Sequence, residues 1–156
     1  NTMSVYRLED EIVINAPLDE VWDFFTDPRN LKKITPEKMA FQNVYEPDAE
    51  KVYPGMLLVY KVSPLLGIPL TWITEITYVE PKRRFVDDQL KGPFGMWHHI
   101  HEFEETEGGT LARDILYYSM PFGFLGTLAH SFTVAKQTKE IFKYRKAALE
   151  KLFPSK

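Results

Sequence analysis

The feature that most constrains the fold is a long alternation of bulky and polar residues around a pair of glycines. It runs through "MWHHIHEFEETEGGT", residues 96–110, and continues in "LARDILYYSM", residues 111–120. Alternation with a period of two is typical of a β-strand, and Gly-Gly supplies the positive φ angles of a tight turn. The sequence therefore predicts an antiparallel hairpin with Gly108 and Gly109 as its two loop residues. Counting outward from this turn predicts four facing pairs: Phe103–Asp114, His101–Leu116, His99–Tyr118 and Trp97–Met120.

The hairpin predicts which histidines are covered, because neighbouring side chains of a strand point to opposite faces. We expect His99 and His101 on the covered face and His98 on the solvent side, with Asp114 diagonal to His101. A register shift of one residue would exchange the two faces. The predicted inner face comprises Trp97, His99, His101, Phe103, Asp114, Leu116 and Tyr118.

Two buried histidines beside a carboxylate are compatible with three roles. A His-x-His pair on a strand could bind zinc, and Asp114 would be the nearest third ligand. Histidine titrates near neutral pH, so His99 or His101, oriented by Asp114, could act in acid–base chemistry. Both could instead be hydrogen-bonded polar residues that fix the core or orient a ligand. These candidates stay open, although so short a match to a metal site leads us to expect no metal and no cofactor.

Residues before the hairpin predict a strand and two short helices. Residues 6–15 alternate like a strand, and residues 16–25 are typical of an amphipathic helix. Asp27 followed by Pro28 predicts the start of a second helix, because aspartate caps helices and proline fits their first turn. The first helix carries an apolar stripe of Leu18, Val21, Trp22 and Phe25.

The rest of the chain completes an α+β fold. Residues 56–62, 70–78 and 85–89 alternate as further strands. Residues from about 126 to 153 carry apolar side chains at helical spacing and predict one long amphipathic helix. The resulting order is a strand, two short helices, about six strands and a long helix. This order is typical of an antiparallel sheet packed against the last helix.

Composition narrows the class of protein. A chain of 156 residues with 44% hydrophobic residues predicts one globular domain, which we place at residues 3–154. A net charge of −3 argues against a nucleic-acid partner, and no apolar run reaches the ~18 residues of a membrane span. The absence of cysteine excludes disulfides and fits a reducing compartment. Charges near the first residues replace the apolar run of a signal peptide. We therefore expect a cytoplasmic monomer or homodimer.

The predicted inner face carries more polar groups than a packed core tolerates. Gln89, His99, His101 and Asp114 would all lie against the last helix, where each unpaired group costs ~1–3 kcal/mol. A hollow that holds water or a ligand would relieve this cost. Arg145, near the inner stripe of the helix, could meet Asp114 or an anionic group of a ligand.

Three segments resemble one known family: "INAPLDEVWDFFTDPRNLKKITP", "GPFGMWHHIHEFEETEGGTLARDILYYSMPFGFLG" and "IFKYRKAALEKLF". They are similar to ligand-binding SRPBCC proteins of the START/Bet v 1-like superfamily, in a bacterial branch labelled polyketide cyclase/dehydrase-like. The resemblance covers nearly the whole chain. It implies a helix-grip fold, in which a curved antiparallel sheet of about seven strands wraps the C-terminal helix and leaves a deep cavity. Catalytic residues vary between branches of the superfamily, so the resemblance transfers none.

The resemblance and the residues together give three functional hypotheses. The first is a protein that binds a hydrophobic small molecule such as a lipid or polyketide. The second is a cyclase or dehydratase that uses His99 or His101 with Asp114. The third is a protein-interaction or regulatory module, for which only Ile100, Ile115 and Tyr117 on the predicted outer face argue. The residues expected to contact a ligand are Tyr60, Trp72, Gln89, Trp97, His99, His101, Tyr118, Phe132 and Arg145.

Overall fold

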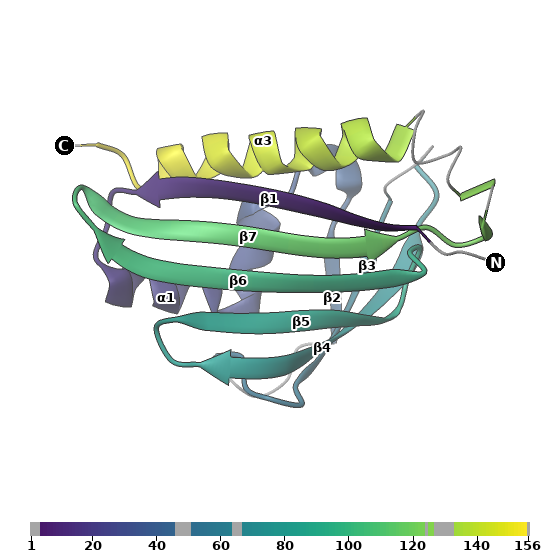
Figure 1. Cartoon of the computed structure of the whole chain (residues 1–156), viewed down its shortest axis with the longest axis horizontal. Coiled ribbons are helices and arrows are strands. Elements are labelled where there is room, and N and C mark those ends of the chain that lie inside the picture. Colours follow the sequence, from purple (N-terminus) through teal and green to yellow (C-terminus); the bar gives the residue numbers. More distant parts are fainter. Residues whose placement is uncertain (1–3, 46–50, 64–66, 124, 127–132, 156) are drawn as a thin grey trace.

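A computed structural model describes residues 4–45, 51–63, 67–123, 125–126 and 133–155. These residues form a curved antiparallel sheet of seven strands, in the spatial order β1-β7-β6-β5-β4-β3-β2, with one long helix against it (Figure 1). The α+β helix-grip prediction is therefore confirmed, although the short β2 was not located from the sequence. The strands are β1 (Val5–Ile14), β2 (Gln42–Tyr45), β3 (Leu57–Val62), β4 (Leu70–Glu80), β5 (Arg84–Lys91), β6 (Met96–Thr106) and β7 (Gly109–Ser119).

The helices follow the sequence signals with two differences. Asp27 caps the second helix as predicted, since its carboxylate accepts a hydrogen bond from the Arg29 N–H at 3.0 Å, but this helix is a 3₁₀-helix. The last helix begins at Ala135 among the described residues, whereas the sequence predicted a helix from about residue 126. Residues 127–132, including the predicted ligand residue Phe132, lie outside the described part of the chain. The helical elements are α1 (Leu18–Phe25), η1 (Pro28–Ile34), η2 (Glu37–Met39) and α3 (Ala135–Leu152).

An apolar core joins α1 to the end of the sheet where β6 turns into β7 (Figure 1). Trp22 packs edge-on against Phe103, with ring centroids 5.6 Å apart, and against Phe85 at 6.0 Å. Leu149 of α3 belongs to the same cluster, so the C-terminal half of α3 is sealed onto the sheet. The predicted stripe of α1 is confirmed, because Val21 and Trp22 are its buried residues.

The predicted register of the hairpin is wrong by two residues. The turn residues are Glu107 and Gly108, and Gly109 already pairs with Thr106 as the first residue of β7. Because the error is an even number of residues, every side chain keeps its predicted face while its partner changes. The observed pairs are Phe103–Ala112, His101–Asp114, His99–Leu116 and Trp97–Tyr118.

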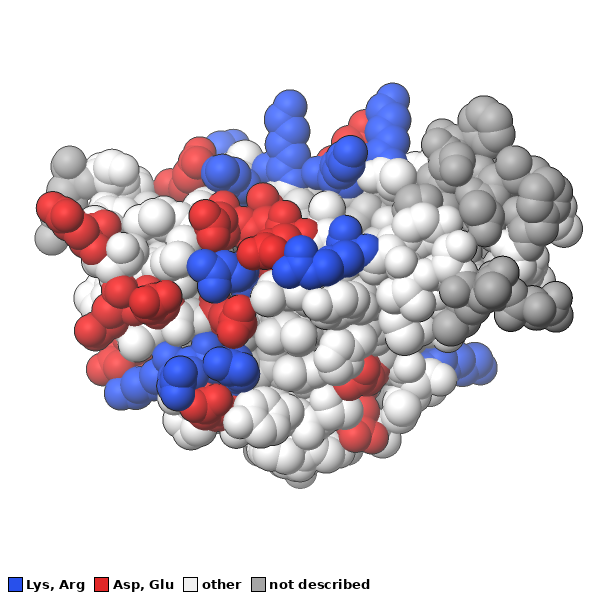
Figure 2. All heavy atoms as spheres, viewed as in Figure 1, with Lys and Arg blue, Asp and Glu red and all other residues white. Residues whose placement is uncertain are grey.

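The outer face of β1, β7 and β6 carries charged side chains of both signs (Figure 2). Arg113 lies within 3.5 Å of Glu9 and within 3.7 Å of Glu102, and these charges lie on three neighbouring strands. His98 also points to this face, as predicted, and its imidazole binds Asp88 at 2.6 Å. No helix of the described residues is both long and apolar enough to cross a membrane.

The hairpin gives a direct test of why Gly109 is a glycine. A Cβ atom at Gly109 would overlap the carbonyl oxygen of Ile14, and its φ is +136°. Gly108 also has a positive φ, +90°, but a Cβ there would meet no atom within 4 Å. We expect Gly108→Ala to destabilise the protein by about 1 kcal/mol from backbone strain alone, and Gly109→Ala by about 3 kcal/mol.

Urea unfolding of the two variants measures this difference in the free energy of unfolding. Equal losses in both variants would show that the close approach of Ile14 does not matter.

Candidate functional site

A cavity of about 410 Å³ lies between the sheet, η1 and the N-terminal half of α3. This volume falls within the range of ~300–1,000 Å³ that is typical of small-molecule sites. Most of the wall is apolar and aromatic. The aromatic and aliphatic wall includes Tyr60, Trp72, Phe94, Trp97, Ile141 and Phe142, and the polar part includes Thr74, Asp87, His99, His101, Gln137 and Arg145.

Most of the predicted ligand residues line this cavity. They are Tyr60, Trp72, Trp97, His99, His101 and Arg145. The aromatic members contact one another: Trp72 meets Trp97 edge-on at 5.1 Å, and Tyr60 stacks on Trp72 at 6.0 Å. These residues therefore lie together on the cavity wall, and their role as ligand contacts stays a prediction.

Two predicted ligand residues lie elsewhere. The amide of Gln89 closes the loop between β5 and β6, since it donates to the Phe94 carbonyl at 2.9 Å and accepts from the Phe94 N–H at 3.2 Å. Tyr118 is only 4% exposed and packs against Tyr6, with ring centroids 5.4 Å apart. Neither residue lines the cavity, because local partners already occupy both side chains.

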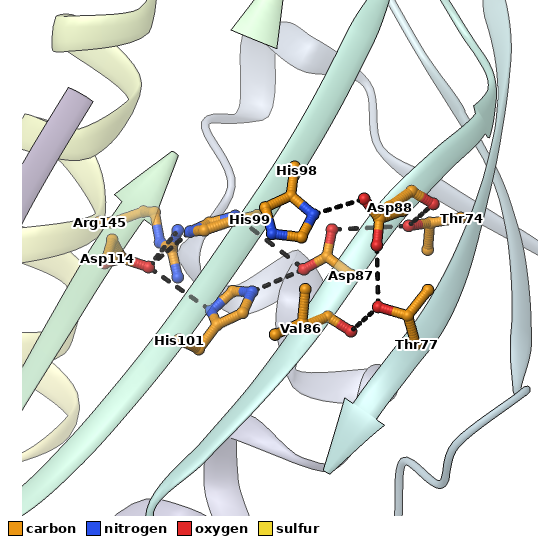
Figure 3. A network of polar contacts seen from close by, with 10 residues as sticks. All are labelled: Thr74, Thr77, Val86, Asp87, Asp88, His98, His99, His101, Asp114 and Arg145. Carbon is orange, nitrogen blue, oxygen red and sulfur yellow. Dashed lines mark hydrogen bonds and ion pairs between the residues drawn. The ribbon is translucent and has the colours of Figure 1, made fainter. Parts of the chain in front are cut away.

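Five charged or ionisable side chains form what we call the histidine–aspartate cluster: Asp87, His99, His101, Asp114 and Arg145 (Figure 3). His99 Nε2 lies 2.8 Å from Asp114 Oδ1, and His101 Nε2 lies 2.6 Å from Asp87 Oδ2. The two imidazoles stack with centroids 3.8 Å apart. Arg145 Nη1 lies 3.6 Å from Asp114 Oδ1. Strands β5, β6 and β7 and helix α3 thus converge on one buried group of charges.

Asp87 is the cluster residue that sequence analysis did not select as a candidate. It shares a face of β5 with Phe85, which stacks on His101 at 4.2 Å, and it pairs with His99 across the sheet. Its place on the same face as Gln89 was the available signal. Asp114, by contrast, was expected beside the histidines. It binds His99 but does not itself line the cavity.

The cluster shifts the pKa values of its two carboxylates in one direction. Burial alone would raise the pKa of Asp114, but Arg145 and the two histidines outweigh it and lower the pKa well below its usual range. Burial likewise opposes ionisation of Asp87, but the hydrogen bond from His101 lowers its pKa. Both carboxylates are therefore negatively charged at neutral pH.

The two histidines shift in opposite directions. Burial lowers the pKa of His99, and the adjacent positive charge of His101 lowers it further. Burial also opposes the charge of His101, but the Asp114 and Asp87 carboxylates outweigh it and raise its pKa. A pair of ionisable groups with diverging pKa values can divide the roles of base and acid between them. His99 is suited to be the neutral base and His101 the charged acid.

Replacing His101 tests this coupling. We expect His101→Gln to raise the pKa of His99, because the neighbouring imidazolium that disfavours its charge is removed. Titration of the ring signals by NMR measures the pKa directly. His98→Gln is the matched control, since His98 lies on the outer face and contacts Asp88. An unchanged or lower pKa of His99 in His101→Gln would contradict the coupling.

Asp87, His99 and His101 are the described residues that could hold a metal ion, because one donor atom of each lies within 4.8 Å of the others. The distance between His101 and Asp87 fits a shared proton better than a shared metal ion. His101 Nε2 and Asp87 Oδ2 lie 2.6 Å apart, whereas two ligands on one tetrahedral zinc keep about 3.3 Å between them. The distance is that of a charge-assisted hydrogen bond.

The curved sheet, the helix that it wraps and the cavity between them define a helix-grip fold. Residues 14–143 match the model of the family described as polyketide cyclase/dehydrase and lipid transport, and the chain belongs to this family. No curated protein matches the chain in sequence.

Solved structures agree with this fold. Protein Ms6760 from Mycobacterium smegmatis is 21% identical, with a TM-score of 0.65 over 94% of this chain and 92% of that chain. Protein CV1439 from Chromobacterium violaceum is 16% identical, with a TM-score of 0.70 over 96% and 99%. Ara h 8.0201 is 13% identical, with a TM-score of 0.60 over 94% and 98%. At these identities the likeness shows the fold alone.

Proposed function

We propose that this protein binds a hydrophobic small molecule, such as a lipid or polyketide, in the cavity between the sheet and α3. The observation that carries the proposal is a mostly apolar cavity of about 410 Å³ into which Asp87, His99, His101 and Arg145 of the histidine–aspartate cluster project. An apolar wall favours burial of a hydrophobic body, and a few fixed polar groups orient it. Membership of a family described by polyketide chemistry and lipid transport supports the same class of ligand.

The aromatic residues of the wall support a flat or ring-containing ligand. Phe94, Trp72 and Trp97 meet at centroid distances of 4.7 to 5.7 Å, and their rings present both faces and edges. Aromatic ligands gain about 0.5–1.5 kcal/mol from such contacts beyond the burial of area. A ketone or hydroxyl on such a ligand could reach His99, whose ring lies 6.3 Å from that of Trp97.

Filling the cavity tests where binding occurs. Ile141 of α3 lines the cavity, so Ile141→Trp should occupy part of it and weaken binding of the aromatic ketone 2-acetylnaphthalene at least about tenfold. Isothermal titration calorimetry measures the affinity. Leu152→Trp is the matched control, because Leu152 lies on the same helix but is exposed and away from the cavity. Unchanged binding in Ile141→Trp would place the ligand elsewhere.

An enzyme that moves a proton next to a ketone is the second candidate, and the opposite pKa shifts of the two histidines favour it. The Nε2–H of His99 donates to Asp114, which leaves its Nδ1 as the basic atom. Nδ1 would take the proton as the carbon–hydrogen bond breaks, and the electron pair would move onto the ketone oxygen. The positively charged His101 would stabilise the developing enolate.

Deuterium exchange of a simple ketone tests this chemistry. We expect the protein to accelerate exchange of the α-hydrogens of 2-tetralone in D₂O, and His99→Gln to slow this exchange by about 100-fold, a typical contribution of a general base. NMR of the ketone measures the rate while calorimetry checks that it still binds. His98→Gln should exchange at the wild-type rate. Exchange no faster than in buffer would leave binding as the function.

A further inference from the structure

The charged groups on the cavity wall already have partners of opposite charge. Among the described residues that line the cavity, those with a carboxylate, imidazole or guanidinium group are Asp27, Asp87, His99, His101 and Arg145. Asp27 binds Arg29 at 2.8 Å, and Asp87 binds His101 at 2.6 Å. The charge of Arg145 faces Asp114 at 3.6 Å. Each acid is therefore matched to a base within the protein.

Arg145 is the residue that a carboxylate ligand would need, and it is engaged on two sides. Its guanidinium lies 5.4 Å from the ring centroid of Phe142 in addition to its contact with Asp114. Its side chain is only 11% exposed, and that of Asp114 is 17% exposed. To meet a ligand anion, Arg145 would have to turn away from a buried carboxylate whose charge it helps to offset, which is unfavourable.

The cavity does offer an uncharged polar group. Tyr60 lines the wall, and its hydroxyl has no hydrogen-bond partner among the residues that the structure describes. Burial raises the pKa of Tyr60 well above its ordinary value, and the negative charge of Asp87 adds to this effect. The hydroxyl therefore keeps its proton and can donate to a ketone or accept from an alcohol.

We propose that the cavity selects electrically neutral ligands with a ketone or hydroxyl oxygen and rejects carboxylates such as fatty acids. A carboxylate would lose its hydration on entry, and the positive charges of His101 and Arg145 on the described wall are already offset by Asp87 and Asp114. It would also approach the carboxylate of Asp87, which lines the cavity. This inference rests on the proposed binding function, and it names the ligand class within it.

Two ligands of nearly the same size and shape, one neutral and one anionic, test the inference. The probes are 2-acetylnaphthalene, a neutral ketone, and 2-naphthoate, which has the same ring system and is an anion at pH 7. Calorimetry on the wild-type protein should show the ketone binding at least about tenfold more tightly than the carboxylate. Equal or tighter binding of 2-naphthoate would overturn the inference while leaving the binding function supported.

A variant that should gain carboxylate binding provides a second test of the inference. Asp114→Asn keeps the size of the side chain but frees the positive charge of Arg145, so 2-naphthoate should bind at least about tenfold more tightly than to the wild type. The double variant with Arg145→Gln should lose this gain. Asp88→Asn is the matched control, since Asp88 pairs with His98 on the outer face and should leave both affinities unchanged.

The outcomes separate the two proposals. Carboxylate binding that Asp114→Asn does not improve, in a variant that circular dichroism shows to be folded, would contradict the role assigned to Arg145. The wild-type comparison decides the selectivity by itself if that variant does not fold. If neither probe binds any form, the binding function fails and the inference fails with it.

Discussion

The structure depends on the pairing of buried charges between three strands and one helix. Asp87 comes from β5, His99 and His101 from β6, Asp114 from β7 and Arg145 from α3 (Figure 3). Removing one partner from a buried ion pair typically costs about 3–5 kcal/mol, because the other charge is left without compensation. The cluster therefore fixes how the helix sits over the sheet. It also supplies most of the charged groups that line a mostly apolar cavity, among the residues that the structure describes.

The local sequence patterns predicted the faces of the strands better than their partners. Side-chain alternation identified the inner face of the hairpin, and a register error of two residues did not disturb it. The error arose because Gly109 is a glycine for a reason unrelated to the turn, namely the close approach of the Ile14 carbonyl. The sequence alone does not distinguish a glycine required by a turn from a glycine required by a close backbone contact. The correct register moves Asp114 from a diagonal position to one directly opposite His101.

Contacts between strands that are not joined by a tight turn could not be predicted in this way. Asp87 enters the cluster through the pairing of β5 with β6, and the loop between these strands carries no tight hairpin signal. Gln89, two residues further along, shares its face but turns to the Phe94 backbone. Spacing predicts which face of a strand a side chain occupies. Nearby hydrogen-bonding groups then determine which partner its polar atoms contact.

The link between Arg145 and Asp114 also constrains how a molecule can reach the interior. Lifting α3 sideways off the sheet would pull apart two oppositely charged groups in a region from which water is largely excluded. One helical turn further along α3, Leu149 packs within the main core. Entry of a ligand past an end of α3 would leave both the Arg145–Asp114 contact and the packing of Leu149 intact. A ligand that enters parallel to the axis of α3 would therefore meet a lower free-energy barrier than one that has to separate α3 from the sheet.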